Sequence, residues 1–146
     1  MKINSVSAAR VLISVIALLT LAGPLHSLAQ TADQPGPSLK VLYFHGNNRC
    51  TTCNNMEKFT RELLDEDYSD ELKNGKVTFE VFNFDEEKNA ELVNRYEVES
   101  STLLIVKVRS GKEKVIDLTE IGFSYAKLEP EKFKEEVARK INDNLR

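Results

Sequence analysis

The sequence predicts an α/β fold in which a mixed sheet of about four strands is flanked by helices. Strand-like and helix-like segments alternate twice along the first part of the 146-residue chain, which is the pattern of two βαβ steps. A turn signal, Arg109-Ser110-Gly111-Lys112, then separates two further strand-like segments, as in an antiparallel hairpin. An amphipathic segment follows the hairpin, and we expect it to form a helix that covers the sheet.

Four segments have the composition of strands, and their apolar patterns differ. Residues 41–44 and 103–106 are continuously apolar, which favours strands that are covered on both faces. Residues 76–84 alternate between apolar and polar side chains before they become apolar throughout, and residues 114–118 alternate as well. We therefore expect strands at all four positions, with residues 114–118 as the antiparallel partner of the strand before them.

Three segments carry apolar residues at helical spacing. The first begins at Cys50 and is closed by the acidic stretch 65–71 and then by Gly75. The second covers residues 86–96 and has acidic residues in its first turn. The third opens at Pro130, because proline is tolerated in the first turn of a helix. The apolar residues of the first and third stripes are Met56, Phe59, Leu63, Leu64, Phe133, Val137, Ile141 and Leu145.

Residues 1–29 have the composition of a secretory signal peptide. Basic residues precede an uncharged apolar run at 11–22, and the small residues Ser27 and Ala29 mark a cleavage site. A membrane anchor is the alternative, but the twelve residues of the run form a helix of only ~18 Å, against a hydrocarbon core of ~30 Å. We expect cleavage and export to the periplasm or the extracellular space, with anchoring by residues 11–22 as the less favoured alternative.

The part of the chain after the signal is expected to hold one folded domain. Residues 30–37 are polar, contain proline and glycine and lack periodicity, so they predict a flexible lead-in to a domain at 38–146. Cleavage removes two of the 20 basic residues and none of the 23 acidic ones, which leaves a formal charge of −5. A mildly acidic surface disfavours nucleic acid and anionic membranes as partners. We expect a monomer.

The motif with the clearest chemistry is Cys50-Thr51-Thr52-Cys53, which contains both cysteines of the chain. Two residues three apart in a helical turn have Cα atoms ~5 Å apart, inside the ~4.4–6.8 Å window of a disulfide. A helix N-terminus favours the thiolate of Cys50, and Arg49 before it adds positive potential. Cys50 is thus the expected attacking sulfur, and the more buried Cys53 the sulfur that resolves a mixed disulfide.

Two other uses of the cysteine pair remain open. One is an inert structural disulfide, which is less favoured than redox use because closing a four-residue loop stabilises a fold by only ~2 kcal/mol, against ~4.7 kcal/mol for a 100-residue loop. The other is a zinc or copper site formed by Cys50, Cys53 and His45, although no fourth ligand is evident. A solvent-contacting histidine at the strand end is the more ordinary expectation for His45. A c-type haem is excluded because Asn54, and not histidine, follows Cys53.

Other polar residues near the motif are expected to have structural roles. Gly46, Asn47 and Asn48 fall between the first strand and the helix and are expected to shape that loop. Tyr43 is expected in the core or at its rim rather than as a proton donor. Glu57, about two turns beyond Cys50, is expected only to solvate the helix.

The order of elements, with a Cys-x-x-Cys motif after the first strand, resembles the thioredoxin fold over nearly all of residues 38–146. This resemblance implies a thiol–disulfide oxidoreductase that acts on protein disulfides and takes electrons from a membrane or exported thiol donor. The segments 43–47 and 49–53 also resemble small exported chains labelled as nitrophenyl compound nitroreductase subunits. Nothing in the sequence resembles a flavin or nicotinamide site, so we expect no cofactor.

The chain departs from typical thioredoxins around the cysteines. Arg49 stands where the family has tryptophan, and Thr51-Thr52 stands where it has Gly-Pro. Phe44 replaces the family's buried acid, and either Ser101 or Thr102 takes the place of its cis-proline. The threonine pair brings no charge that would stabilise a thiolate. We therefore expect a dithiol reductant or electron carrier, with a potential nearer about −270 mV than about −120 mV. The alternative function is a non-catalytic accessory or binding subunit whose thiols hold a metal or whose surface docks one partner.

Overall fold

The computed structural model describes residues 38–145, so the predicted signal peptide at 1–29 and lead-in at 30–37 lie outside the described residues. Within that range the chain forms a four-stranded sheet with the order β2-β1-β3-β4. Strand β1 pairs in parallel with β2 and antiparallel with β3, and β3 pairs antiparallel with β4. The predicted mixed sheet is confirmed. The strands are β1 (Leu39–His45), β2 (Val77–Asn83), β3 (Thr102–Arg109) and β4 (Lys112–Asp117).

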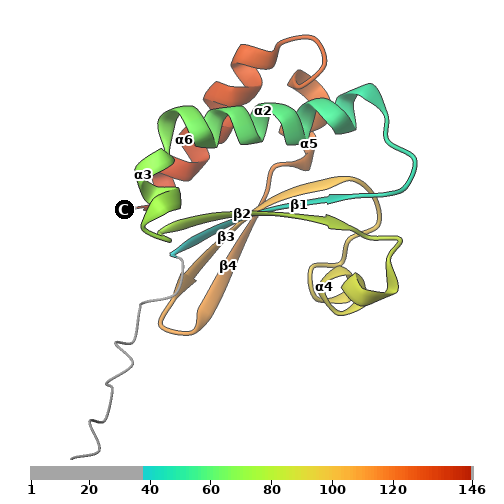
Figure 1. The fold of residues 1–146 in the computed structure, drawn as a ribbon, viewed down its shortest axis with the longest axis horizontal. Coiled ribbons are helices and arrows are strands. Elements are labelled where there is room, and N and C mark those ends of the chain that lie inside the picture. Colours follow the sequence, from blue (N-terminus) through green and yellow to red (C-terminus); the bar gives the residue numbers. More distant parts are fainter. Residues whose placement is uncertain (1–37, 146) are drawn as a thin grey trace, which may run out of the picture. The chain divides into compact units, whose positions relative to one another are not determined.

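Helices lie on both faces of this sheet (Figure 1). One face is covered by α2 and α6, with the short helices α3 and α5 beside them, and the other by a 3₁₀ turn and α4. The helical elements are α2 (Thr51–Asp67), α3 (Ser69–Lys73), the 3₁₀ turn η1 (Glu87–Asn89), α4 (Ala90–Arg95), α5 (Thr119–Tyr125) and α6 (Pro130–Leu145). Among residues 38–145, no helix has both the length and the apolar character needed to span a bilayer.

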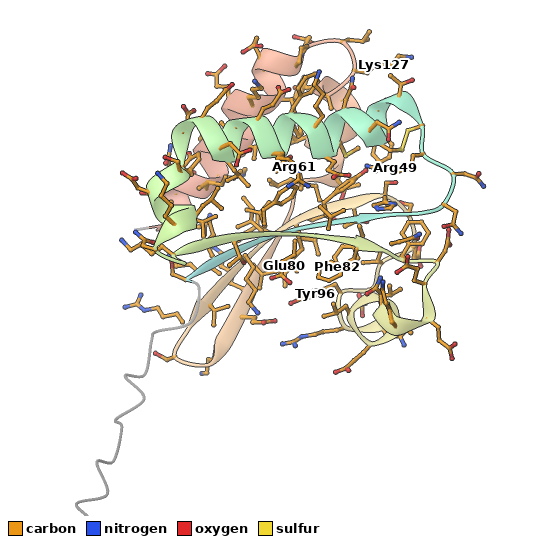
Figure 2. All side chains as sticks on the ribbon, in the orientation of Figure 1. Arg49, Arg61, Glu80, Phe82, Tyr96 and Lys127 are labelled. Carbon is orange, nitrogen blue, oxygen red and sulfur yellow. A yellow bond between two sulfur atoms is a disulfide. The ribbon has the colours of Figure 1, made fainter. Side chains whose placement is uncertain are left out.

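Strand β1 contributes buried side chains to both sides of the sheet, because successive side chains of a strand point to opposite faces. Leu39, Val41 and Tyr43 are fully buried on the α2 and α6 side, together with Phe133 of α6. Phe44, also fully buried, points to the other face. There it stacks on Phe82 and contacts Tyr96, which Figure 2 shows on the α4 side of the sheet. The apolar run at residues 41–44 is therefore covered on both faces of the sheet, as predicted.

Helix α5 was not predicted from the sequence. It is only seven residues long, and within its bounds Gly122 is buried while Ile121 and Tyr125 are partly buried against the core. An apolar stripe of this length is too short to be told from other segments by its spacing. The packing of α5 explains the glycine, since a Cβ at position 122 would lie 2.5 Å from the Sδ atom of the buried Met56. This close approach sets α5 directly against α2, one turn beyond the cysteine motif.

The other boundaries differ from the predicted ones in small ways. The strands extend into polar residues because backbone pairing continues past the apolar run, as at His45, which pairs with Asn83. The single helix predicted at 86–96 is instead η1 followed by α4. The first helix ends at Asp67, α3 follows, and Gly75 takes a positive φ of 74° beyond it.

Candidate functional site

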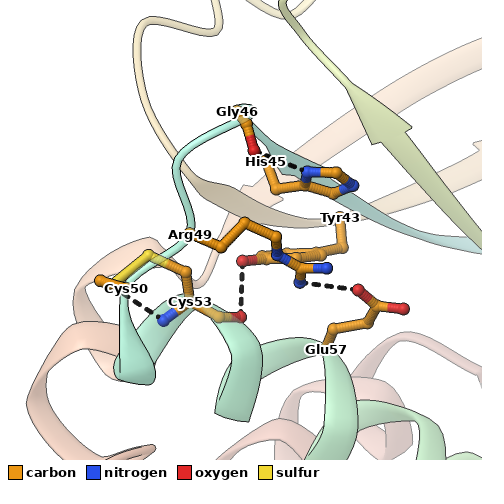
Figure 3. Close-up of a disulfide and its surroundings, with 7 residues drawn as sticks. All are labelled: Tyr43, His45, Gly46, Arg49, Cys50, Cys53 and Glu57. Carbon is orange, nitrogen blue, oxygen red and sulfur yellow. Dashed lines mark hydrogen bonds and ion pairs between the residues drawn. A yellow bond between two sulfur atoms is a disulfide. The ribbon is translucent and has the colours of Figure 1, made fainter.

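Cys50 and Cys53 form a disulfide at the start of α2 (Figure 3). Cys50 is the N-cap residue, in an extended conformation with φ −77° and ψ 166°. Its Sγ atom accepts a hydrogen bond from the backbone N–H of Cys53 at 3.1 Å, and its carbonyl accepts one from Asn54 N–H at 3.0 Å. The Cα atoms of the two cysteines are 5.1 Å apart, which agrees with the distance that the spacing predicts.

The two sulfur-bearing residues differ in their access to solvent. Cys50 is exposed, whereas Cys53 has only 6% of its surface exposed and forms part of the core side of α2. A thiol or disulfide of another molecule can therefore reach Cys50 more readily than Cys53. The N-cap position also places the Cys50 sulfur among the unpaired N–H groups of the first helical turn, which stabilise negative charge.

Tyr43 lies directly beneath this turn. It is fully buried on β1, and its hydroxyl donates a hydrogen bond to the Cys53 carbonyl at 2.7 Å. Burial raises the pKa of Tyr43, and hydrogen bonds with the side chains of Ser101 and Arg49 only partly oppose this. The phenol is therefore neutral near physiological pH, and its O–H group remains the donor of the hydrogen bond to the Cys53 carbonyl. The sequence placed Tyr43 in the core or at its rim but gave no sign of this contact with the motif.

Arg49 and Glu57 form an ion pair beside the same turn. The Arg49 Nη2 atom is 2.7 Å from the Glu57 Oε2 atom, and the guanidinium Cζ lies 5.7 Å from the centroid of the Tyr43 ring. Glu57 also pairs with Arg61, whose Nη2 atom is 3.0 Å from Oε1. Figure 2 shows both arginines between α2 and the sheet. Glu57 is thus a partner of Arg49, and the expectation that it only solvates the helix is wrong.

The ionisation of this pair follows from its surroundings. Burial acts to raise the pKa of Glu57, but the hydrogen bonds and positive charges of Arg49 and Arg61 outweigh it and hold that pKa below its usual value. Burial likewise acts to lower the pKa of Arg49, and Glu57 together with Tyr43 overcomes it and raises that pKa. Both groups are charged near neutral pH. The charge of Arg49, which we expected to act on Cys50, is therefore engaged by Glu57.

The loop before Cys50 is held by polar contacts with the segment after β2. Asn47 N–H donates to Asp85 Oδ2 at 2.7 Å, and the Asn83 amide donates to Asn47 Oδ1 at 2.8 Å. Gly46 packs closely against Phe84 of the same segment, since a Cβ at position 46 would lie 2.8 Å from the Phe84 Cζ atom. The predicted role of Gly46 and Asn47 in shaping the loop agrees with these contacts, whereas Asp85 was not identified from the sequence.

The remaining predicted site residues surround the motif at different depths. His45 ends β1, where its Nδ1 atom is 3.0 Å from the Gly46 carbonyl oxygen. Thr51 is exposed and Thr52 half-buried in the first turn of α2. Ser101, 9% exposed, is the residue that reaches Tyr43, whereas Thr102 opens β3 and donates from its Oγ1 atom to the Ser100 carbonyl. No peptide bond within residues 38–145 is cis.

The metal alternative is not supported by the arrangement of side chains. Within the described part of the chain, no three His, Cys, Asp or Glu side chains are grouped so that they could hold a metal ion. His45 is therefore not brought together with the two cysteines as a ligand set, and the two sulfurs are bonded to each other. The spacing of these residues in the sequence was compatible with a metal site. Spacing alone does not show where the histidine ring points, so it could not exclude one.

Comparison with known proteins gives matches among solved structures only. No family model matches the chain, and a search of curated proteins finds no match. A thioredoxin of Fasciola hepatica is 18% identical with a TM-score of 0.46, over 75% of this chain and 83% of that one. Trxlp of Edwardsiella tarda is 15% identical with a TM-score of 0.44, over 70% and 84%. An uncharacterised thioredoxin-like protein of Clostridium perfringens is 18% identical with a TM-score of 0.40, over 74% and 93%.

The fold class follows from the chain's own strand order and directions. The sheet has the order β2-β1-β3-β4, and β3 runs antiparallel to both of its neighbours. In the described residues, only β1, α2 and β2 therefore form a parallel βαβ unit, and the second of the two predicted βαβ steps is wrong, because the chain reverses its strand direction after α4. The fold is thioredoxin-like, with a closely spaced Cys50–Cys53 pair at the junction of the β1 loop and α2. This combination is consistent with thiol–disulfide exchange. The resemblance to nitrophenyl compound nitroreductase subunits stays a prediction.

Proposed function

We propose that the protein is a thiol–disulfide oxidoreductase that uses Cys50 and Cys53. The observation that carries the proposal is the asymmetry of the pair: an exposed N-cap cysteine is bonded to a buried cysteine that lies one turn into the helix. The exposed sulfur can attack a disulfide of another protein, and the buried one can attack only what is already bound to Cys50. We expect the N-terminus of α2 to lower the pKa of the Cys50 thiol once the pair is reduced.

In the reducing direction the exchange has two steps. The Cys50 thiolate attacks one sulfur of the substrate disulfide, a mixed disulfide forms, and the released substrate thiolate takes up a proton. The Cys53 thiol then loses its proton and attacks the Cys50 sulfur, which frees the second substrate thiolate. Two electrons pass to the substrate, and the Cys50–Cys53 disulfide is restored. A thiol donor must then reduce it again, and we propose a membrane or exported dithiol for this role.

The direction of electron flow is tested by titrating the disulfide against glutathione. Thr51 and Thr52 place no charge between the cysteines that would favour the reduced form, so we expect a potential near about −270 mV. The fraction of reduced pair is read by alkylation and mass spectrometry, with the double variant Cys50→Ser/Cys53→Ser as the blank. A value above about −150 mV would reverse the proposed direction. A pair that never equilibrates with glutathione would instead be an inert bridge or part of an accessory subunit.

We further propose that the protein is exported and acts as a monomer. The support for export is the charged, apolar and small-residue pattern of residues 1–29, which would place the disulfide in an oxidising compartment. N-terminal sequencing of the protein from the exported fraction should begin at Gln30. A mature chain that still begins at Met1 would contradict cleavage and favour anchoring by residues 11–22.

A further inference from the structure

The segment closed by the disulfide is also closed by an ion pair. Arg49 directly precedes Cys50, and Glu57 follows Cys53 by one helical turn. Their side chains meet with Nη2 and Oε2 atoms 2.7 Å apart and are only 26% and 21% exposed (Figure 3). A short, partly shielded pair with a guanidinium donor is stronger than an ordinary surface pair. The ion pair therefore joins the residue before Cys50 to a residue after Cys53, so that it spans the whole cysteine turn.

This ion pair rests on Tyr43, which ties the same turn to the sheet. The Tyr43 ring lies under the guanidinium, and its hydroxyl donates to the carbonyl of Cys53. None of these contacts involves a sulfur atom, so reduction of the disulfide removes none of their atoms. The turn would thus keep a set of non-covalent contacts after its covalent link is broken.

We propose that Arg49 and Glu57 are positioning residues that form a clasp, which holds the Cys50 and Cys53 thiols at closing distance in the reduced protein. The clasp, defined as the Arg49–Glu57 ion pair, lowers the conformational freedom that the dithiol must lose to form the disulfide. It therefore shifts the equilibrium of the pair toward the disulfide. This inference rests on the proposed function in one respect, namely that the pair exchanges with external thiols.

The reaction that reports on the clasp is closure of the dithiol by glutathione disulfide. Cys50 forms a mixed disulfide with one glutathione and releases the other as a thiol, and Cys53 then displaces the bound glutathione. Two electrons leave the cysteine pair, the glutathione disulfide is reduced, and both protons end on the two glutathione thiols. The equilibrium constant of this reaction measures how well the folded chain presents its two thiols to each other.

The test compares Arg49→Gln with the matched control Arg61→Gln. Each variant removes one arginine from Glu57, but only Arg49 lies on the other side of the cysteine turn, since Arg61 follows Glu57 on α2. We expect Arg49→Gln to lower the closure constant about threefold to tenfold and Arg61→Gln to change it by less than about 1.5-fold. Glu57→Gln should match Arg49→Gln, and the double variant Arg49→Gln/Glu57→Gln should be no worse than either single one.

The sign of the effect separates the clasp from a direct effect of charge. If Arg49 acted by stabilising the Cys50 thiolate, its removal would disfavour the dithiol and raise the closure constant, which would overturn the proposal. Equal constants for Arg49→Gln and Arg61→Gln would overturn it as well. Circular dichroism and urea unfolding identify a variant that has lost its fold, and Glu57→Gln then provides the measurement. A wild-type pair that does not exchange with glutathione contradicts the proposed function itself, so the two failures are distinguishable.

Discussion

Replacing Cys50 with serine is expected to abolish reduction of protein disulfides by this chain, with a loss of about a thousandfold or more. A serine hydroxyl is not ionised near neutral pH, and Cys53 is too buried to replace the exposed sulfur. The measurement is the rate at which the prereduced protein reduces insulin disulfides. A Cys50→Ser protein that keeps a rate within about tenfold of the wild type would contradict the assignment of Cys50 as the attacking residue.

The complementary variant Cys53→Ser should stop the reaction one step later. The exposed Cys50 sulfur remains, so a mixed disulfide with the substrate forms but is not resolved. Mass spectrometry should show a covalent adduct on Cys50 that dithiothreitol removes. Asn54→Ser is the matched control, because Asn54 is exposed, follows the motif directly and contributes its backbone rather than its side chain to the turn. It should form no stable adduct and retain the wild-type rate.

Phe133→Ala is expected to lower the free energy of unfolding by about 3–5 kcal/mol. Phe133 is fully buried on α6 within the core formed between the sheet and the helices α2 and α6. Its truncation removes apolar burial and leaves a cavity that the fixed sheet and α2 can fill only in part. A loss of this size is a large part of the stability of a domain, which is about 5–15 kcal/mol. Urea unfolding should show a lower midpoint with an unchanged slope.

Phe123→Ala provides the control for this prediction. Phe123 is a phenylalanine on α5, but 47% of its surface is exposed, so the same truncation should cost less than about 1 kcal/mol. If both variants lost the same stability, the packing of α6 against the sheet would not be the main support of the fold. The result also bears on the site, because α6 and α5 pack against α2, which carries both cysteines.

The fold could be predicted from the sequence because its main signals are local. The continuous apolar run of β1, the helical stripe of α2 and the turn at Ser110 and Gly111 each depend on neighbouring residues. Both turn residues have positive φ in the structure, as a tight hairpin requires. Helix α5 was missed because it is only seven residues long, so that Ile121 and Tyr125 form too short a stripe to be recognised, and because the close approach of Gly122 to Met56 has no signal in the sequence. No apolar pattern records such a contact.

The position of the cysteine motif in the chain could be predicted from the sequence, but the side-chain contacts around it could not. The helical spacing of the apolar residues after the motif placed Cys50 at the start of a helix, and the structure has it as the N-cap residue of α2. The contacts around the motif were not evident: Tyr43 of β1 donates to the Cys53 carbonyl, Ser101 reaches Tyr43, and Glu57 of α2 pairs with Arg49. Charged residues in a helix usually face solvent, so only the folded geometry shows that Glu57 is committed to Arg49.

The rate at which the reduced protein is alkylated by iodoacetamide near neutral pH tests most directly whether residue 50 is an accessible, ionisable nucleophile. Peptide mapping assigns the label to each cysteine, and the protein unfolded in urea gives the rate of an unperturbed thiol. The account predicts that Cys50 in the folded protein reacts about fivefold faster than in the unfolded chain, while Cys53 reacts more slowly. A folded Cys50 that reacts no faster than its unfolded counterpart would contradict the account.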